Sequence, residues 1–460
     1  MTTVDKRVPL LFLISDTGGG HRSAAQAVGE ALERHFPGQF EPVLADPLTG
    51  PGTPPGMRWF VSLYSPLIRL TPWLWHVSWR FSNRPLGLSI MYKTAFAPAR
   101  TTVTRAIDAC RPAAVVAFHG MVTRPAVLAR QRMMLPPVPI LTVITDLVTA
   151  HRAWREPRVD QIAVPSPAVG RSCQADGYPP GRCTDTGLPV SAAFTAPPAT
   201  ESERLALRGA LGAVPDRFLV VLTGGAAGAG KLYPKAMALV RSLADVTVVT
   251  VCGRNDQLLR KLTRQARWYG DRLLPLGFVT NMADWLRCAD AVVTKAGPGT
   301  IAETLCCGTP LLLTSYLSGQ EKGNAEFVVS AGAGRWVPRM TELLDAVRDL
   351  RDDPKLLGQM RVAAARIGRP DAAAAVARLI ADLAAPPVGG LVAAAETGIK
   401  PVPIRRRIRA RGDVVTSGAQ HRRSERLGAS ARRAKSTARS AARNPPVRLA
   451  TSVGRALLLK

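Results

Sequence analysis

One stretch in the second half of the chain carries the clearest chemical pattern. A short apolar run at 291–293 enters a loop without bulky side chains, and a helix-compatible segment at 301–306 follows. The loop consists of Lys295, Ala296, Gly297, Pro298, Gly299 and Thr300. Backbone N–H groups and a helix N-terminus beside such a loop bind a phosphate or diphosphate without a metal ion. Glu303, in the first turn or so of the helix, and Gln320 and Glu321 in the next loop can hold sugar hydroxyls. This stretch therefore predicts a nucleotide-sugar site.

A second candidate is the glycine-rich turn that contains Gly19 and Gly20 and ends at His21. A helix is expected to follow at 22–36. A histidine in the first turn of a helix lies in a positive dipole field, which lowers its pKa and keeps it neutral. A neutral imidazole is what deprotonation of an acceptor hydroxyl requires. The alternative is a turn that only lets strand and helix pack closely, with His21 as a polar N-terminal residue.

A third glycine-rich loop begins at Gly224 and Gly225. Residues 225–231 match the GxxxxGK part of a phosphate-binding P-loop, but Leu232 replaces the Ser or Thr that would ligate magnesium. An NTPase is therefore disfavoured. We expect these glycines to let the backbone approach the donor diphosphate from the side opposite to Gly297 and Gly299.

Polar residues also follow a predicted strand at 140–145. Asp146, His151 and Trp154 are expected to border the acceptor site, or else to form a surface loop with a hydrogen-bonded histidine. The chain contains no Asp-x-Asp pair. This absence argues against a magnesium-bridged nucleotide. It favours stabilisation of the diphosphate by a helix dipole, backbone amides and Lys295.

The elements that must position these residues alternate between strands and helices in both halves of the chain. Apolar runs, each ending at polar or glycine residues, are expected at 8–14, 115–119, 140–145, 218–223, 246–252, 274–278, 291–294 and 310–314. This alternation predicts an α/β fold with two doubly wound, Rossmann-like domains that face a central cleft. Gly187 to Val190 and the proline-rich stretch 196–200 indicate a linker. The predicted domains are 1–192 for the acceptor and membrane and 193–385 for the UDP-sugar. A basic tail follows at 386–460.

Charge and composition indicate the compartment and the partners that are expected for this chain. The net charge is +28, and the tail alone holds 17 Lys and Arg against three Asp and Glu. This composition predicts disorder and attraction to anionic lipids or polymers. The tail contains no Phe, Tyr or Trp, so base stacking and specific nucleic-acid binding are not expected. The seven cysteines form no CxxC pair and fit a reducing compartment. No signal-type or membrane-spanning run is present, which predicts a cytoplasmic or peripheral protein.

An aromatic segment at 59–79 interrupts the alternation. It holds four of the eight tryptophans, together with Arg69. The four are Trp59, Trp73, Trp75 and Trp79. Aromatic residues interleaved with arginine suit an interfacial helix in the headgroup zone of a membrane. The alternative is a hydrophobic lid packed on the N-terminal domain.

With these residues assembled, the chain resembles the monogalactosyldiacylglycerol synthase and processive diacylglycerol glucosyltransferase family, relatives of the peptidoglycan glycosyltransferase MurG. The motifs that carry the resemblance are SDTGGGHRSAAQAV at 15–28 and TNMADWLRCADAVVTKAGPGTIAETLCCGTPLLLTSYLSGQEKGNAEFVV at 280–329. Weaker similarity spans most of 8–385. The resemblance implies a GT-B fold and an inverting transfer that needs no metal and no cofactor, because the UDP-sugar is a co-substrate.

The resemblance also implies roles for individual residues. His21 would be the catalytic base, Glu303 would bind the ribose hydroxyls, and Phe278 and Val279 would flank the uracil. The sugar would be held by Gln320, Glu321 and Asn324, and the diphosphate would face Gly297, Gly299 and Thr300. In the family, the aromatic and basic N-terminal region serves the membrane and the lipid acceptor.

The predicted function is transfer of a hexose from a UDP-sugar to a lipid, foremost diacylglycerol. The product is a β-glycolipid, made on the inner face of the cell membrane, and the anionic membrane surface is the expected partner. Three alternatives stay open. The first is a UDP-N-acetylglucosamine-dependent transferase acting on a polyprenyl-linked or secondary-metabolite acceptor. A UDP-N-acetylglucosamine epimerase and a tail-driven nucleic-acid-binding protein are less favoured.

Overall fold

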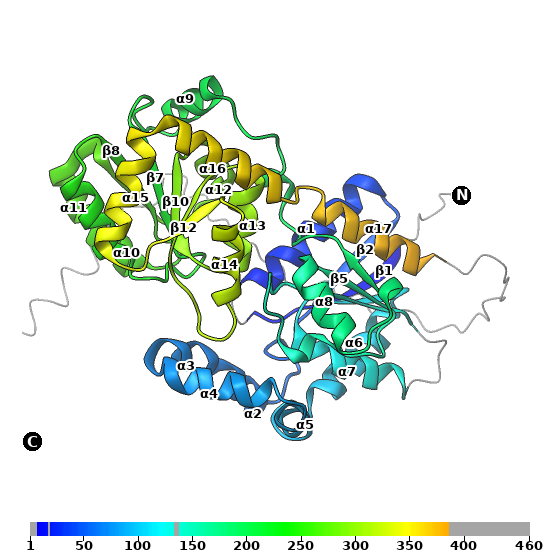
Figure 1. Cartoon of the computed structure of the whole chain (residues 1–460). Coiled ribbons are helices and arrows are strands. Elements are labelled where there is room, and N and C mark those ends of the chain that lie inside the picture. The colour runs from blue at the N-terminus through cyan, green and yellow to red at the C-terminus, as the bar shows by residue number, and fades with distance from the viewer. Residues whose placement is uncertain (1–6, 17–18, 133–137, 386–460) are drawn as a thin grey trace, which may run out of the picture. The chain divides into compact units, whose positions relative to one another are not determined.

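The computed structural model describes residues 7–16, 19–132 and 138–385 (Figure 1). The basic tail predicted at 386–460 lies outside these residues. Within them, two six-stranded sheets form, and every strand pairing is parallel. Parallel sheets are covered by helices on both faces and need continuous apolar strands. Strand β8 (Val246–Val251), for example, is buried at all six positions. The predicted α/β class with two doubly wound sheets is confirmed.

The first sheet has the order β2-β1-β3-β4-β5-β6. Its strands are β1 (Val8–Leu13), β2 (Phe40–Ala45), β3 (Ala114–Ala117), β4 (Ile140–Val143), β5 (Gln161–Val164) and β6 (Cys183–Asp185). The helices that accompany it are α1 (Gly20–His35), α2 (Pro55–Ser62), α3 (Tyr64–Leu70), α4 (Pro72–Ser82), α5 (Pro85–Lys93), α6 (Ala99–Cys110), α7 (Gly120–Arg130) and α8 (Pro167–Ala175), with short 3₁₀ turns η1 (Arg152–Trp154) and η2 (Pro180–Arg182). The strand order reverses between β1 and β3. Ligands of open α/β sheets bind at the carboxyl edge beside such a reversal.

The second sheet has the order β12-β11-β10-β7-β8-β9. Its strands are β7 (Phe218–Thr223), β8, β9 (Leu273–Leu276), β10 (Ala291–Lys295), β11 (Leu311–Ser315) and β12 (Gly334–Trp336). The helices are α9 (Glu201–Ala210), α10 (Leu232–Ser242), α11 (Asp256–Tyr269), α12 (Met282–Cys288), α13 (Pro298–Cys306), α14 (Lys322–Ser330), α15 (Met340–Asp352), α16 (Pro354–Ile367) and α17 (Ala372–Ala384), with η3 (Ala192–Phe194) and η4 (Gly270–Arg272). The reversal lies between β7 and β10. The two glycine-rich loops predicted to face the diphosphate follow these neighbouring strands.

The hydrophobic core has one layer on each face of each sheet. In the first sheet, α1 covers one face, and α6 and α7 cover the other. In the second sheet, α10 and α15 cover one face, and α12 to α14 cover the other. The last helix, α17, packs on α1, and its Val376 and Ile380 are fully buried with Leu10 and Phe12 of β1. A helix from the predicted second domain thus completes the core of the first sheet. The domain boundary predicted at residue 192 stays a prediction.

The predicted strand ends agree with the structure to within two residues, whereas the helix expected at 301–306 begins three residues earlier, at Pro298. The strand expected at 140–145 ends at Val143, so that Thr145 and Asp146 belong to the loop at the carboxyl edge. The aromatic segment 59–79, which suits an interfacial helix, forms parts of three helices, α2, α3 and α4. Thr71 breaks the segment with φ −135° and ψ 65°. The physical reason is Pro72, which disfavours helical backbone at the preceding residue.

Candidate active site

His21 occupies the first turn of α1, directly after the turn that follows β1. Its Nδ1 lies 2.9 Å from the Thr145 hydroxyl oxygen. Its ring meets the ring of His119 edge-on at 4.5 Å between centroids, and the Trp154 ring lies 6.0 Å away. His119 is the N-cap of α7, which follows β3. The two histidines therefore meet because they follow the two strands between which the first sheet reverses its order.

Of the two glycines before His21, only Gly19 has a backbone conformation that favours glycine. Gly19 has φ +80°, a backbone conformation that L residues rarely adopt. Gly20 has no such constraint, and a side-chain carbon at either position would meet nothing within 4 Å. The space beside this turn is therefore open, as an approaching acceptor would require. The predicted acceptor role of Gly19 and Gly20 stays a prediction.

The pKa of His21 lies below its ordinary value, chiefly because burial disfavours the charged imidazolium. The carboxylates of Asp146 and Asp16 and a backbone hydrogen bond with Phe118 act in the opposite direction. The lowered pKa has the direction predicted from the dipole of α1, but burial is its main cause. His119 is also held neutral, since burial and the neighbouring histidines lower its pKa well below the usual range. The site therefore presents neutral imidazole at cellular pH.

Asp146 is the polar centre of this site. It is buried and accepts hydrogen bonds from Trp154 Nε1 at 2.7 Å, from Gln320 Nε2 at 2.8 Å and from the His151 backbone N–H at 3.3 Å. Gln320 belongs to the loop after β11, in the half of the chain that carries the second sheet. A residue predicted on the acceptor side and one predicted on the sugar side thus meet directly.

His151 lies between Asp146 and the aromatic helices. Its Nδ1 accepts from the Ala153 backbone N–H at 3.1 Å, so that Nε2 carries the proton and donates to the Ser82 hydroxyl at 3.1 Å. Burial, together with the charge of Arg155, lowers the pKa of His151 to about 4. His151 is therefore a neutral, hydrogen-bonded residue that joins the η1 turn to α4. This arrangement matches the alternative of a hydrogen-bonded histidine, and its predicted acceptor role stays a prediction.

The loop between β10 and α13 forms the predicted diphosphate side. Gly297 caps α13 without a side-chain hydrogen bond, so that the N-terminal N–H groups of this helix have no side-chain cap. Gly299 and Thr300 lie in the first turn, and a side-chain carbon at Gly299 would meet nothing within 4 Å. Glu303 lies in the second turn rather than the first. An uncapped helix N-terminus of this kind suits an anion.

Lys295 and Glu321 face each other beside this helix. Lys295 Nζ lies 2.5 Å from Glu321 Oε1, and Glu321 Oε2 accepts from the Leu317 backbone N–H at 2.8 Å. The charge of Lys295 is therefore paired with a buried carboxylate. Asn324 donates from Nδ2 to the Ala296 carbonyl at 3.0 Å, and its buried Oδ1 has no hydrogen-bond partner among the described residues.

Glu303 is half-buried, and burial raises its pKa to about 7. A carboxyl group with this pKa changes its charge in the cellular pH range. Its predicted partner, a ribose diol, donates hydrogen bonds and therefore favours the charged carboxylate. Among the residues of the predicted donor site, Glu303 is therefore the one whose charge should change most when the ligand binds.

The remaining donor-side residues lie at the carboxyl edge of the second sheet. Gly224 is packed so closely that a side-chain carbon would lie 1.9 Å from the Ala229 carbonyl oxygen, and Gly225 has φ +70°. Phe278 is exposed, and the Arg254 guanidinium lies 5.4 Å from its ring centroid. Val279 packs at the edge of the core beneath α12. A side-chain carbon at Gly225 would meet nothing within 4 Å, and Phe278 is exposed beside Arg254. The predicted roles of these residues in nucleotide binding stay predictions.

Several residues of this site were missed by the sequence analysis. They are Thr145, His119, Arg254, Ser82 and His76. His119 and Arg254 each follow the end of an apolar strand, a signal that could have identified them. Ser82 and His76 lie on α4 and gave no signal, because their contacts join segments far apart in the sequence.

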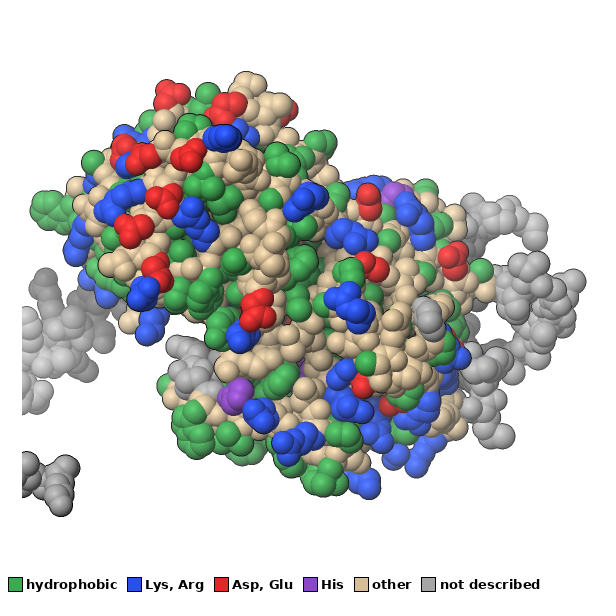
Figure 2. Space-filling model, in the orientation of Figure 1, with side chains coloured by type: hydrophobic (Ala, Val, Ile, Leu, Met, Phe, Trp, Pro, Cys, Tyr) green, Lys and Arg blue, Asp and Glu red, His purple; other side chains and the backbone are tan. Residues whose placement is uncertain are grey.

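The four tryptophans of the aromatic segment fall into two pairs. Trp59 and Trp73 are 64% and 68% exposed, whereas Trp75 and Trp79 are half-buried. Hydrophobic side chains gather over α2 to α5, with Lys and Arg beside them (Figure 2). Across the part of the chain that the structure describes, no helix has both the length and the apolar character needed to cross a bilayer. The described residues also hold no group of three His, Cys, Asp or Glu placed to share a metal ion.

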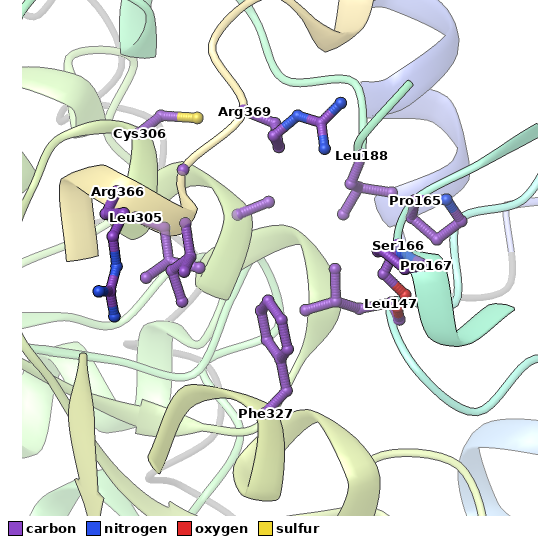
Figure 3. Close-up of a pocket in the computed structure, with 13 residues that line it drawn as sticks. Leu147, Pro165, Ser166, Pro167, Leu188, Leu305, Cys306, Phe327, Arg366 and Arg369 are labelled. Carbon is purple, nitrogen blue, oxygen red and sulfur yellow. Dashed lines mark hydrogen bonds between the residues drawn. The ribbon is translucent and has the colours of Figure 1, made fainter. Parts of the chain in front are cut away.

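The structure also contains a cavity of about 240 Å³ (Figure 3). It is lined by the apolar face of α13, by Leu147 and Phe327, and by Arg366 and Arg369. No predicted site residue lines it. Ala302 and Cys306 of α13 also pack with Leu188 and Val190 of the predicted linker, which is therefore partly buried.

The chain is similar to known proteins over most of its length. Residues 21–190 match the family model of monogalactosyldiacylglycerol (MGDG) synthase, and 219–376 match the glycosyltransferase family 28 C-terminal domain. A protein named probable monogalactosyldiacylglycerol synthase, from Glycine max, is 32% identical over 82% of this chain and 71% of its own length. Monogalactosyldiacylglycerol synthase 1 of Arabidopsis thaliana is 31% identical over 80% and 69%. Among solved structures, Acinetobacter baumannii MurG has a TM-score of 0.53 at 17% identity and covers 82% of this chain and 99% of its own, which shows a shared GT-B fold.

Proposed function

Because the chain belongs to the monogalactosyldiacylglycerol synthase family and is a UDP-sugar-dependent hexosyltransferase with the GT-B fold, we propose that its acceptor is diacylglycerol at a membrane surface. The product would be a β-linked hexosyl diacylglycerol. We place the enzyme on the inner face of the cell membrane, bound through the exposed side chains of α2 to α5. The relatives are named for transfer of galactose, which makes UDP-galactose the first donor to test.

The observation that supports this function best is the contact between Asp146 and Gln320. Asp146 lies beside His21 and raises its pKa, while Gln320 belongs to the loop predicted to hold the hexose. The group that activates the acceptor and the group that orients the donor sugar therefore share one carboxylate. Direct transfer between two substrates requires this proximity.

In the proposed reaction, the UDP-hexose diphosphate faces the N-terminus of α13 and the backbone of the 224–231 loop. The hydroxyl oxygen of diacylglycerol attacks the anomeric carbon from the face opposite UDP. The new glycosidic C–O bond forms as the bond to the UDP oxygen breaks, and His21 takes the hydroxyl proton. The negative charge that develops on UDP meets backbone N–H groups and the helix dipole. The neutral state of His21 makes it ready to accept this proton.

The test is transfer from a panel of radiolabelled UDP-sugars to vesicles that contain diacylglycerol, with the lipid product identified. His21→Ala should lower the rate about 10²- to 10⁴-fold and leave the affinity for UDP nearly unchanged. His35→Ala, at the exposed end of the same helix, is the matched control and should keep the wild-type rate. Retained turnover in His21→Ala would remove that residue from the role of base.

The substrate assignment has its own outcomes. Transfer of N-acetylglucosamine to a polyprenyl-linked lipid, with no product from diacylglycerol, would replace the proposed acceptor. Release of a free sugar that is independent of any acceptor would argue for epimerase-type chemistry instead.

A further inference from the structure

Helix α4 has two faces of different character. Trp73, Val77 and Phe81 are spaced four residues apart and are exposed at 68%, 54% and 47%. Trp75, His76 and Trp79 lie on the other side and are half-buried. Residues three and four apart share a helix face, so α4 presents one apolar stripe outward and one aromatic stripe inward. The inner face lies against the rest of the protein, where His76 and Trp79 contact the loop 317–321 and Trp79 also contacts His151.

The inner face contacts the loop 317–321, which connects β11 to α14. His76 Nδ1 lies 3.0 Å from the Ser318 hydroxyl oxygen. Gly319 has φ +88° and lies directly under the Trp79 indole, because a side-chain carbon there would be 2.9 Å from Trp79 Cε3. Both the backbone angle and the close approach therefore require glycine at this position. Segments 240 residues apart in the sequence are thus held together by one helix face.

Two hydrogen bonds between Leu317 and Glu321 tie the two ends of the loop 317–321 together. The Glu321 backbone N–H donates to the Leu317 carbonyl at 3.0 Å, and the Leu317 N–H donates to the Glu321 carboxylate at 2.8 Å. Gln320, between them, reaches Asp146. A shift of Ser318 or Gly319 would therefore also move the side chains of Gln320 and Glu321.

The same helix is anchored to the acceptor side. The Trp79 ring meets the His151 ring edge-on at 5.8 Å, and Ser82 hydrogen-bonds to His151 Nε2. Tyr64 of α3 packs edge-on against Trp75 at 5.1 Å. Burial, with the charges of the Asp146 and Glu321 carboxylates, raises the pKa of Tyr64. The inner face of α4 therefore contacts both His151, on the predicted acceptor side, and the loop 317–321, on the predicted donor side.

The outer face of α4 is apolar and exposed to solvent. The free energy falls when a lipid surface covers an apolar stripe that was exposed to water. Among the described residues, α4 packs on α3 and α5 and contacts the loop 317–321 through its inner face, whereas Trp73, Val77 and Phe81 stay exposed. Insertion of the outer face would restrain the helix on both sides and, through His76 and Trp79, restrain the loop 317–321. Because UDP lacks the hexose, its affinity should not increase when the loop 317–321 is better ordered.

We propose that α4 couples docking on a lipid surface to binding of the donor hexose, with Trp73, Val77 and Phe81 entering the lipid and His76 and Trp79 positioning the loop 317–321. This inference rests on the proposed function, because it takes Gln320 and Glu321 as the hexose contacts. His76 and Trp79 are then positioning residues for the donor, rather than parts of a membrane anchor.

The test measures affinity by calorimetry for UDP and for the tighter of UDP-galactose and UDP-glucose, using the full chain. Each titration is done with and without vesicles of phosphatidylcholine and phosphatidylglycerol that lack diacylglycerol, so that no turnover occurs. Vesicles should tighten UDP-hexose binding about three- to tenfold and change UDP binding less than about twofold.

Matched variants separate the two faces of α4. Trp73→Ala should weaken vesicle co-sedimentation and, without vesicles, bind UDP-hexose like the wild type. Trp79→Ala and His76→Ala should keep vesicle binding, weaken UDP-hexose about three- to tenfold and abolish the vesicle effect. His76→Asn keeps a polar atom near the position of Nδ1 and should restore most of the affinity. Trp268→Ala, at a tryptophan of α11 that is even more exposed than Trp73, is the control and should change neither measurement.

Equal vesicle effects on UDP and UDP-hexose, an effect of opposite sign, or inner-face variants with unchanged hexose affinity would overturn the coupling. A failure of the proposed function has a different signature. In that case no glycolipid forms from any UDP-sugar and diacylglycerol, whatever the binding titrations show.

Discussion

At the scale of single residues, the chemistry depends on burial more than on local dipoles. His21 is neutral chiefly because its surroundings exclude water, and Asp146 limits how far its pKa falls. A base of too low a pKa accepts protons poorly, whereas one of too high a pKa is already protonated. Asp146 therefore sets the working range of His21 through its charge, in addition to its contact with Gln320.

Asp146→Asn tests this electrostatic role. Removing the negative charge should lower the pKa of His21 further, so that the acid limb of the pH–rate profile moves to lower pH. The wild-type limb should already lie below 6.5, the ordinary histidine value, because burial lowers the pKa of His21. Asp108→Asn, on the exposed side of α6, should leave the limb in place. A limb that moves to higher pH in Asp146→Asn would contradict this account.

Glu303 gives a second pH dependence on the donor side. Burial raises its pKa to about 7, and ribose hydroxyls that donate to the carboxylate favour the charged form. The affinity for UDP-hexose should therefore rise with pH and be about tenfold higher near pH 8 than near pH 6. Calorimetry in buffers of different ionisation enthalpy should detect proton release near pH 7.

Glu303→Gln is the matched variant for this prediction, because it keeps the shape and removes the titration. Its affinity for UDP-hexose should be nearly independent of pH over the same range. An unchanged slope in Glu303→Gln would assign the pH dependence to another group.

At the scale of elements, close approaches of backbone to side chains fix the site. Helix α7 begins at Gly120, where an added side-chain carbon would lie 3.1 Å from the Trp154 backbone nitrogen and 3.2 Å from its ring. Trp154 in turn holds Asp146 by its indole N–H. The start of one helix thus positions the carboxylate that bridges both substrate sides.

Gly120→Ala should displace Trp154 by a few tenths of an ångström and lower kcat about three- to tenfold. The affinity for UDP should stay unchanged, because the donor loops lie on the other sheet. Gly358→Ala in α16, where nothing lies within 4 Å, should keep the wild-type kcat and raise the free energy of unfolding by about 0.5–1 kcal/mol. Wild-type kcat in Gly120→Ala would show that Trp154 tolerates the shift.

At the scale of the whole molecule, α17 ties the end of the folded chain to its beginning. It follows the second sheet in sequence, yet Ala373, Val376 and Ile380 are buried against the first sheet. The stability of the sheet that carries His21 therefore depends on residues almost 360 positions away. A chain cut before α17 would expose this apolar surface.

Ile380→Ala should lower the free energy of unfolding by about 2–4 kcal/mol, because Ile380 is fully buried. Urea unfolding followed by circular dichroism provides the measurement. Arg378→Ala, on the exposed side of the same helix, should change it by less than about 0.5 kcal/mol. Equal effects of the two substitutions would show that α17 contributes little to the core.

Much of this molecule can be predicted from its sequence, because the governing interactions are local. Apolar runs such as 218–223 form strands whatever surrounds them, and glycine-rich turns at their ends mark the carboxyl edge of each sheet. The motifs around His21 and 291–329 identify the family, since loop composition and helix starts are written in consecutive residues. The α/β class, the GT-B fold and the hexosyltransferase activity follow from these patterns.

Tertiary structure alone decided which of these residues meet. Strand order brought His119 beside His21, and no spacing in the sequence encodes that contact. Burial lowered the pKa values of His21, His119 and His151 and raised the pKa of Glu303 to about 7, because desolvation depends on neighbours from many segments. The pairing of Lys295 with Glu321, the contact of Gln320 with Asp146 and the inward turn of His76 and Trp79 also join distant segments. Local chemistry thus determined what the site contains, and packing determined how its parts are connected.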